Sequence, residues 1–154
     1  MVYWVSPIGP NELFNMINRE FKYACITDVM FLLLLDARAK EHYNESHIIT
    51  AKLAQRDKDE MYTVSLDYEL ECRTNIVVYD HSTTESDLIN QVVTPALQCA
   101  KTMWECSKQT SIQVLTGGYK DFSAFYPFLR TRKLFYLPKA CLKLKFTHFD
   151  KKSS

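Results

Sequence analysis

The residues best placed to do chemistry follow a short apolar segment in the middle of the chain, Asn75 to Tyr79. Directly after it comes a run of polar residues, many of them helix-capping types: Asp80, His81, Ser82, Thr83, Thr84, Glu85, Ser86 and Asp87. A loop between a strand and a helix can hold an anion on its free backbone N–H groups. However, Glu85 and Asp87 would place two more carboxylates beside Asp80, and like charges a few ångströms apart disfavour a bound anion.

The same loop also has a purely structural interpretation. Ser82 and Glu85 have the spacing of a capping box, in which a hydroxyl and a carboxylate satisfy the free N–H groups of a helix start, worth about 1 kcal/mol. We favour this structural role over a ligand site.

Three further positions carry reactive side chains. Cys72 precedes Arg73, whose charge favours a thiolate, but no histidine lies nearby in sequence to act as a base. A half-buried structural thiol is therefore the favoured interpretation of Cys72. His42 and His47 are five residues apart with only acidic or polar neighbours, so we expect no metal site and no cofactor.

The expected architecture is an α/β domain with a central parallel sheet of about five strands and helices on both faces. Apolar or β-branched runs predict strands at 29–35, 47–51, 75–80 and 112–115. Helices are expected from Pro10 to about Phe21, from Thr84 to about Trp104 with a possible break at Pro95, and over 122–129. Residues 37–44 suggest a helical turn, and 52–60 a solvated loop.

Composition narrows the functional classes. The chain has 154 residues, 47% of them hydrophobic, which is enough for one hydrophobic core. Because 19 Lys+Arg nearly balance 18 Asp+Glu, the chain has no overall positive potential that would attract nucleic acid. Five cysteines without a C-x-x-C pair indicate reduced thiols and an intracellular, cytoplasmic location; mitochondrial association stays open. The longest apolar run, Val29 to Leu35, is too short for a membrane span.

Two stretches together resemble a known family. Leu35-Asp36-Ala37-Arg38, followed by Ser46-His47-Ile48, and the later Thr116-Gly117-Gly118-Tyr119 turn are similar in order and spacing to the rhodanese-like domain. The resemblance covers about Pro10 to Phe128. Asp36 and Arg38 are then interpreted as a hydrogen-bonded pair at a strand end, and His47 as a packed histidine. Gly117, Gly118 and Tyr119 form the turn after the last strand.

The segment from Gly117 to Pro127 most resembles the non-catalytic amino-terminal domains of MAP kinase phosphatases and of related pseudophosphatases. That resemblance implies a phosphatase-like domain downstream, so the chain would be a domain fragment or a short isoform. The rhodanese-like domain is placed at 8–130. Residues 131–154 are assigned to a basic and apolar extension, which we expect to lie as a strap over the domain rather than on a membrane.

The resemblance also bears on catalysis. Active members carry a cysteine where this chain has Asp80, and a phosphatase-type loop would have arginine where it has Ser86. A carboxylate cannot accept sulfur, so we expect no enzymatic turnover. The domain is expected to bind proteins, as a regulatory module in phosphatase or kinase signalling. The least favoured hypothesis is that it is a thiosulfate sulfurtransferase.

An alternative function is docking of MAP kinases. The related phosphatase domains use a basic cluster after the second strand, which would pair with an acidic groove. The corresponding residues here are Lys52, Arg56 and Lys58, but Asp57, Asp59 and Glu60 alternate with them. Because this alternation cancels the local field, kinase docking ranks below the general protein-binding role.

Overall fold

The computed structural model describes residues 5–23, 31–70, 73–107 and 112–132. A five-stranded parallel sheet forms its centre, in the order β1-β6-β5-β2-β4. The strands are β1 (Val5–Ile8), β2 (Leu32–Asp36), β4 (Lys52–Leu53), β5 (Asn75–Tyr79) and β6 (Ile112–Leu115). The expected fold class is therefore confirmed, and β2, β5 and β6 were predicted from the sequence.

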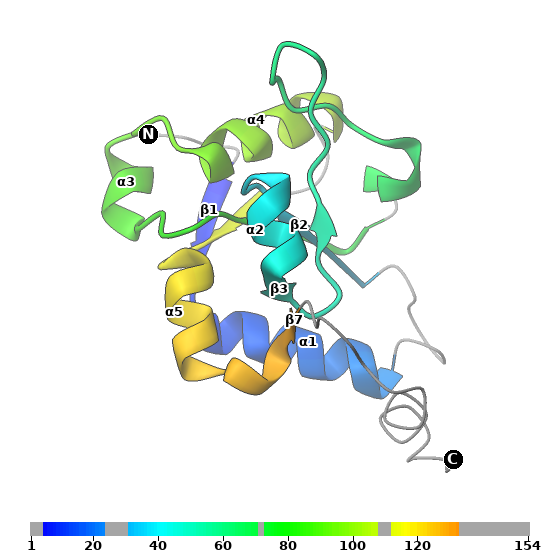
Figure 1. The fold of residues 1–154 in the computed structure, drawn as a ribbon, viewed down its shortest axis with the longest axis vertical. Helices are drawn as coiled ribbons and strands as arrows, with labels where there is room; N and C mark the ends of the chain where they lie inside the picture. The colour runs from blue at the N-terminus through cyan, green and yellow to red at the C-terminus, as the bar shows by residue number, and fades with distance from the viewer. Residues whose placement is uncertain (1–4, 24–30, 71–72, 108–111, 133–154) are drawn as a thin grey trace.

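Helices cover both faces of this sheet (Figure 1). On one side lie α3 (Glu85–Ile89) and α4 (Pro95–Ser107), and on the other α1 (Pro10–Tyr23) and α5 (Gly118–Phe125). The short α2 (Lys40–Glu45) follows β2. Two 3-10 turns, η1 (Leu66–Tyr68) and η3 (Pro127–Leu129), complete the helical elements of the described residues.

The uniform apolar run of β2 is explained by burial on both faces. Leu33 and Leu35 belong to the core under α4, with Leu97 and Met103, whereas Leu32 and Leu34 belong to the core with α1 and α5. All four leucines are at most 4% exposed. Burying each such side chain contributes roughly 1.5–3 kcal/mol, so β2 is stabilised from both faces of the sheet.

One strand prediction and one loop prediction were wrong. The segment predicted as a sheet strand over 47–51 gives β3 (Ser46–Ile48), which pairs antiparallel with β7 (Arg130–Arg132) in a separate two-stranded sheet. β2 lies between β5 and β4 in the main sheet, and β4 falls inside the segment expected to be a loop. β1 was not predicted, because Pro7 lies within it; it forms an edge of the sheet, where proline is tolerated.

The helix expected over 84–104 is two helices. The backbone turns at Gln91, which has a φ of 56°, and Pro95 then begins α4. Proline is favoured in the first turn of a helix because its missing N–H would have no partner there. The helix expected over 122–129 begins earlier, at Gly118, and ends at Phe125 before η3.

The described elements run from β1, which begins at Val5, to β7, which ends at Arg132. Residues 133–154, the rest of the predicted extension, lie outside the described residues. In the described parts of the chain, no helix is both long and apolar enough to cross a bilayer.

Candidate functional site

A pocket of about 360 Å³ lies at the carboxyl ends of β2 and β5. Parallel α/β sheets commonly bind ligands outside this edge, because loops and helix starts converge there. Its lining comes from the segment after β2, from the loop after β5 and from the start of α4: Ala37, Arg38, Ala39, His42, Arg56, Asp80, His81, Ser82, Thr83, Asp87, Thr94 and Pro95.

The Asp80 carboxylate is bonded inside the fold. Asp80 is 3% exposed, and its Oδ1 accepts hydrogen bonds from the N–H groups of Ser82 at 3.1 Å and Thr83 at 2.9 Å. Its Oδ2 accepts from the Thr83 hydroxyl at 2.5 Å and from the N–H of Ala96, in the first turn of α4, at 3.1 Å. The carboxylate therefore occupies donors that an anion bound to this loop would need.

The capping box lies two residues later than predicted. Thr84, not Ser82, is the N-cap of α3: its hydroxyl accepts from the N–H of Asp87 at 3.2 Å. The Asp87 carboxylate accepts from the N–H of Thr84 at 3.0 Å. Ser82 lies instead in the turn that is closed by the Asp80 carboxylate. Glu85 and Ser86 are exposed in the first turn of α3. Asp80 and Asp87 line the pocket and Glu85 does not, so the three loop carboxylates do not all surround it.

The backbone of the same loop holds the start of α5. The carbonyl oxygens of Asp80 and His81 accept from the N–H groups of Tyr119 at 2.8 Å and Lys120 at 3.0 Å. Gly117 and Gly118 have φ values of 81° and 61°, and a Cβ on Gly118 would lie 2.6 Å from the carbonyl oxygen of Asp80. The two glycines therefore allow the backbone of this turn to approach the loop after β5 closely.

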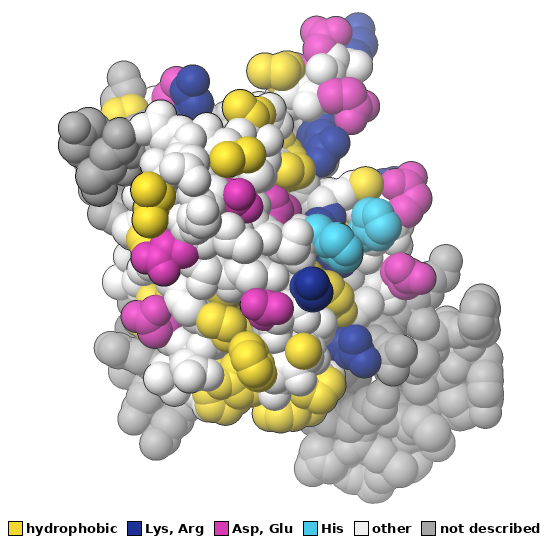
Figure 2. All heavy atoms as spheres, turned by 90° about the vertical axis from the view of Figure 1, so that its left-hand side faces the viewer, with side chains coloured by type: hydrophobic (Ala, Val, Ile, Leu, Met, Phe, Trp, Pro, Cys, Tyr) yellow, Lys and Arg dark blue, Asp and Glu magenta, His cyan; other side chains and the backbone are white. Residues whose placement is uncertain are grey.

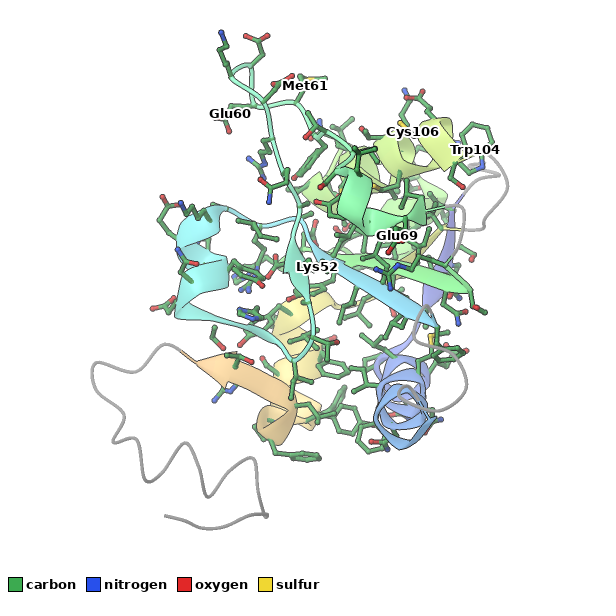
Figure 3. All side chains as sticks on the ribbon, turned by 90° about the vertical axis from the view of Figure 1, so that its right-hand side faces the viewer. Lys52, Glu60, Met61, Glu69, Trp104 and Cys106 are labelled. Atoms are coloured by element: carbon green, nitrogen blue, oxygen red, sulfur yellow. The ribbon has the colours of Figure 1, made fainter. Side chains whose placement is uncertain are left out.

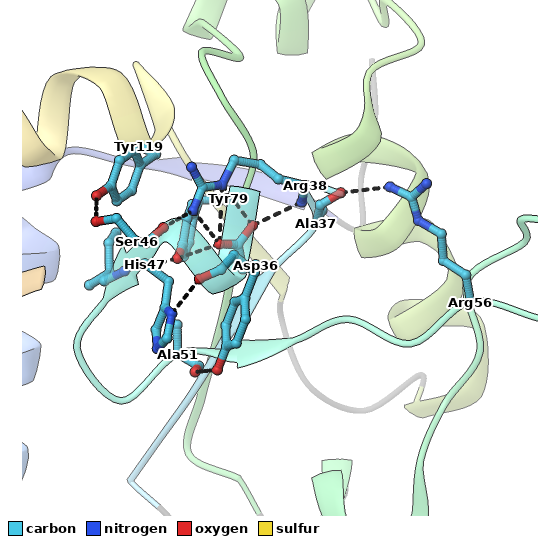
Figure 4. Close-up of polar contacts among 11 residues, drawn as sticks. Asp36, Ala37, Arg38, Ser46, His47, Ala51, Arg56, Tyr79 and Tyr119 are labelled. Atoms are coloured by element: carbon cyan, nitrogen blue, oxygen red, sulfur yellow. Dashed lines mark hydrogen bonds and ion pairs between the residues drawn. The ribbon is translucent and has the colours of Figure 1, made fainter. Parts of the chain in front are cut away.

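Asp36 and Arg38 form a buried ion pair beside the pocket (Figure 4). The Nη2 of Arg38 lies 2.7 Å from Oδ2 of Asp36, and the same nitrogen donates to the Ser46 carbonyl at 2.6 Å. The guanidinium lies over the Tyr119 ring, 4.1 Å from its centroid. Burial opposes the charge of Arg38, but its hydrogen bond to Asp36 and the charge of Asp36 raise its pKa above the ordinary value.

This network joins the separate motifs of the sequence. The Ser46 and Tyr119 hydroxyls share a short hydrogen bond, which ties the turn after β6 to β3. His47 is half-buried: its ring stacks on Tyr43 with centroids 3.8 Å apart, and its Nδ1 lies 2.8 Å from the Tyr43 carbonyl oxygen. His47 does not line the pocket.

The three candidate docking cations are not gathered into a cluster. Residues 54–63 form a projecting hairpin closed by a bridge between Arg56 and Tyr62 (Figure 3). Arg56 is held at its base, where Nη2 donates to the Ala37 carbonyl at 3.0 Å and to the Tyr62 hydroxyl at 2.8 Å. Lys58 is exposed near the tip, whereas Lys52 is half-buried in β4.

The described cysteines are poorly placed for catalysis in this pocket. Cys99 is fully buried in α4, and burial raises its pKa to about 12. Cys106 is exposed near the other end of α4, eleven residues from Pro95 and hence roughly 16 Å along the helix axis. Cys72 lies outside the described residues. Within those residues, no group of three or more His, Cys, Asp or Glu side chains could hold a metal ion.

One feature was missed by reasoning from sequence. His81 approaches His42 across the opening of the pocket, with ring centroids 6.0 Å apart. The two residues are 39 positions apart, and no local pattern marks them as neighbours. Only the placement of α2 beside the loop after β5 brings them together.

The chain matches one known protein family and is similar to several solved structures. The family described as "Rhodanese-like domain" matches residues 19–125. Among solved structures, an As-Sb reductase from Leishmania major is 16% identical with a TM-score of 0.56, covering 85% of this chain and 87% of that one. The BH2092 protein from Bacillus halodurans is 15% identical with a TM-score of 0.50, covering 77% and 72%.

A third similar structure is Ygr203w from Saccharomyces cerevisiae, described as a homologue of single-domain rhodanese and of the Cdc25 phosphatase catalytic domain. It is 15% identical with a TM-score of 0.48, covering 84% of this chain and 89% of that one. At 16% and 15% identity, the Leishmania major and Bacillus halodurans structures support the fold alone. No curated protein sequence matches the chain.

Proposed function

The chain belongs to the rhodanese-like domain family, and we propose that it is a catalytically inactive member that binds other proteins as a regulatory module. The observation that carries this proposal is the identity and bonding of Asp80. In active relatives, the residue after the corresponding strand is a nucleophilic cysteine. Here it is a buried carboxylate whose oxygens accept four hydrogen bonds.

The surroundings of Asp80 support the same conclusion. Sulfur or phosphoryl transfer by a thiol needs a thiolate facing a cup of free N–H groups. The described lining of the pocket contains no cysteine, and the Ser82, Thr83 and Ala96 N–H groups are already bonded to Asp80. Reductase or phosphatase chemistry, as named for the similar structures, is therefore disfavoured for this chain.

We further propose that the chain resembles the domains of MAP kinase phosphatases and pseudophosphatases in its role, in phosphatase or kinase signalling. Docking of a kinase through Lys52, Arg56 and Lys58 gains no support from their arrangement. Arg56 is turned toward Ala37 and Tyr62, and Lys58 is flanked by two aspartates. A partner surface that includes the pocket rim is the better candidate.

A direct assay tests the absence of turnover. Purified protein is given thiosulfate and cyanide, and separately p-nitrophenyl phosphate, beside an active single-domain rhodanese and an active phosphatase. We expect rates equal to those without protein. Turnover that depends on protein and disappears in Cys72→Ser or Cys106→Ser would overturn the proposal.

The binding role is tested with a surface variant. Ser82 is exposed on the pocket rim, so Ser82→Glu changes the rim without touching the core. Lys101→Glu, at an exposed position of α4, is the matched control. Partners captured from cells should be lost with Ser82→Glu and kept with Lys101→Glu; identical capture by both variants would exclude the rim as the binding surface.

A further inference from the structure

Two exposed histidines meet at the opening of the pocket, on the side where α2 faces the loop after β5. His42 lies within α2, and His81 directly follows Asp80. Their ring centroids are 6.0 Å apart, and the ring planes are inclined by 28°. Figure 2 shows two histidine side chains side by side on this face of the molecule.

The backbones that carry the two rings are fixed independently. The loop after β5 is held by the hydrogen bonds of the Asp80 carboxylate and by the start of α5. On the other side, the hydroxyl of Tyr43, next to His42 in α2, donates to the Ala51 carbonyl at 2.6 Å. The rings themselves are exposed, so they can turn about their side-chain torsions while their backbones stay in place.

Neighbouring charged groups leave the two imidazoles free to bind a ligand. No hydrogen bond or ion pair of His42 or His81 side chains occurs within the described residues, whereas the Asp80 and Asp87 carboxylates are engaged with backbone N–H groups. Arg38 is paired with Asp36, and Arg56 with Glu60. The two rings are thus imidazole donors with no hydrogen-bond or ion-pair partner among the described residues on this side of the pocket.

We propose that His42 and His81 chelate one divalent transition metal ion of the Ni²⁺, Cu²⁺ or Zn²⁺ type, with water in the remaining positions. Imidazole nitrogen suits these ions, whereas Mg²⁺ and Ca²⁺ prefer oxygen. Two rings on a fixed framework bind better than one, because the second is already at a high effective concentration. The site does not depend on the proposed protein-binding role.

A bound ion would join α2 to the loop that carries Asp80. Because both rings line the pocket, the link would narrow its opening and hold the two walls together. Metal binding is thus expected to slow hydrogen exchange of the loop amides, since local opening of the loop would have to break the chelate.

The test uses untagged protein and Ni²⁺ alone. The background is Cys106→Ser, which removes the one exposed thiol among the described residues. Calorimetric titration measures stoichiometry and affinity, and paramagnetic broadening of amide NMR signals locates the ion. The variants are His42→Gln and His81→Gln. The matched control is His47→Gln, since the His47 ring is half-buried with one nitrogen already in contact with the Tyr43 carbonyl.

We expect one Ni²⁺ per chain, with broadening first at residues 40–45 and 80–83. Each of His42→Gln and His81→Gln should lower the affinity about tenfold or more, because a single imidazole cannot chelate. His47→Gln should bind Ni²⁺ like the background protein. The proposal is overturned if no Ni²⁺ binds, if either rim variant binds as the background does, or if broadening begins elsewhere.

Discussion

The hydroxyl of Tyr79, the last residue of β5, donates a hydrogen bond of 2.8 Å to the carboxylate of Asp36, the last residue of β2. The same hydroxyl accepts from the N–H of Ile48 at 3.1 Å. Two neighbouring strands and β3 therefore end on one buried polar centre. Burial and the nearby charge of Asp36 both raise the pKa of Tyr79 well above its ordinary value, so the phenol stays protonated as a donor.

Removing Arg38 should be strongly destabilising. Arg38→Met leaves the fully buried Asp36 carboxylate without its counter-charge, and such a change costs about 3–5 kcal/mol. Urea unfolding measures the loss. The double variant Asp36→Asn, Arg38→Met should lose less than the single variant, because no buried charge remains. Glu60→Gln, which breaks an exposed pair with Arg56, should change stability by less than about 1 kcal/mol.

Asp80 should prove a structural residue. Asp80→Ala removes a charged acceptor from two N–H groups of its own loop and one of α4, so a loss of about 1.5–3 kcal/mol or more is expected. Asp80→Asn keeps an acceptor oxygen and should lose less. Chemical denaturation compares the two variants. Equal stability of Asp80→Ala and the unaltered protein would contradict the bonding described for this loop.

The two glycines of the turn after β6 should differ. A Cβ on Gly118 would lie 2.6 Å from backbone atoms of both Asp80 and His81, which cannot move aside. On Gly117, the close atoms belong to the Asp121 side chain, whose carboxylate can rotate away, and only its Cβ, 2.7 Å away, is held in place by the backbone. Both alanine variants bear the cost of positive φ, about 1 kcal/mol. Gly118→Ala should therefore have the lower thermal midpoint, and the reverse order would refute the close approach.

The two described thiols should differ in reactivity. Cys106 is exposed and should react with iodoacetamide in the native state. Cys99 is fully buried with a pKa raised by burial to about 12, so its alkylation should wait for unfolding. Peptide mass spectrometry after timed labelling distinguishes the two sites. Fast labelling of Cys99 without denaturant would show that α4 opens readily.

Deprotonation of Tyr62 should lower the stability of the folded protein at alkaline pH. Burial raises the pKa of Tyr62 from 10.0 to about 12, so the folded state holds the phenolic proton more tightly than the unfolded chain. The stabilisation is complete below about pH 10 and is lost as the pH rises through about 12. Tyr62→Phe should show a shallower decline than the unaltered protein over this range. Parallel curves from urea unfolding would contradict the prediction.

The core strands and the turn after β6 were predictable because local composition decides them. Leu32–Leu35 and Ile76–Tyr79 are apolar enough to be buried on both faces, and the paired glycines permit the turn after β6. The capping box was displaced because several hydroxyls and carboxylates lie in a row. The Asp80 carboxylate accepts hydrogen bonds from the N–H groups of Ser82 and Thr83, so Thr84 is the residue left to cap the helix.

Pairing of the shorter strands could not be deduced from local pattern. Ser46–Ile48 and Lys52–Leu53 are both short, and their partners, β7 and β2, are set by distant parts of the chain. The contact between His42 and His81 has the same origin. Tertiary packing, rather than propensity, places such residues.

Edge strand β1 also limits how the sheet can meet other chains. The carbonyl of Ile8 accepts from Thr116 at the end of β6, so the preceding residue, Pro7, turns its backbone toward the open side. Proline has no N–H group to donate there, so a strand that paired with β1 would lack one hydrogen bond of the ladder. Pro7 therefore disfavours edge-to-edge aggregation through β1.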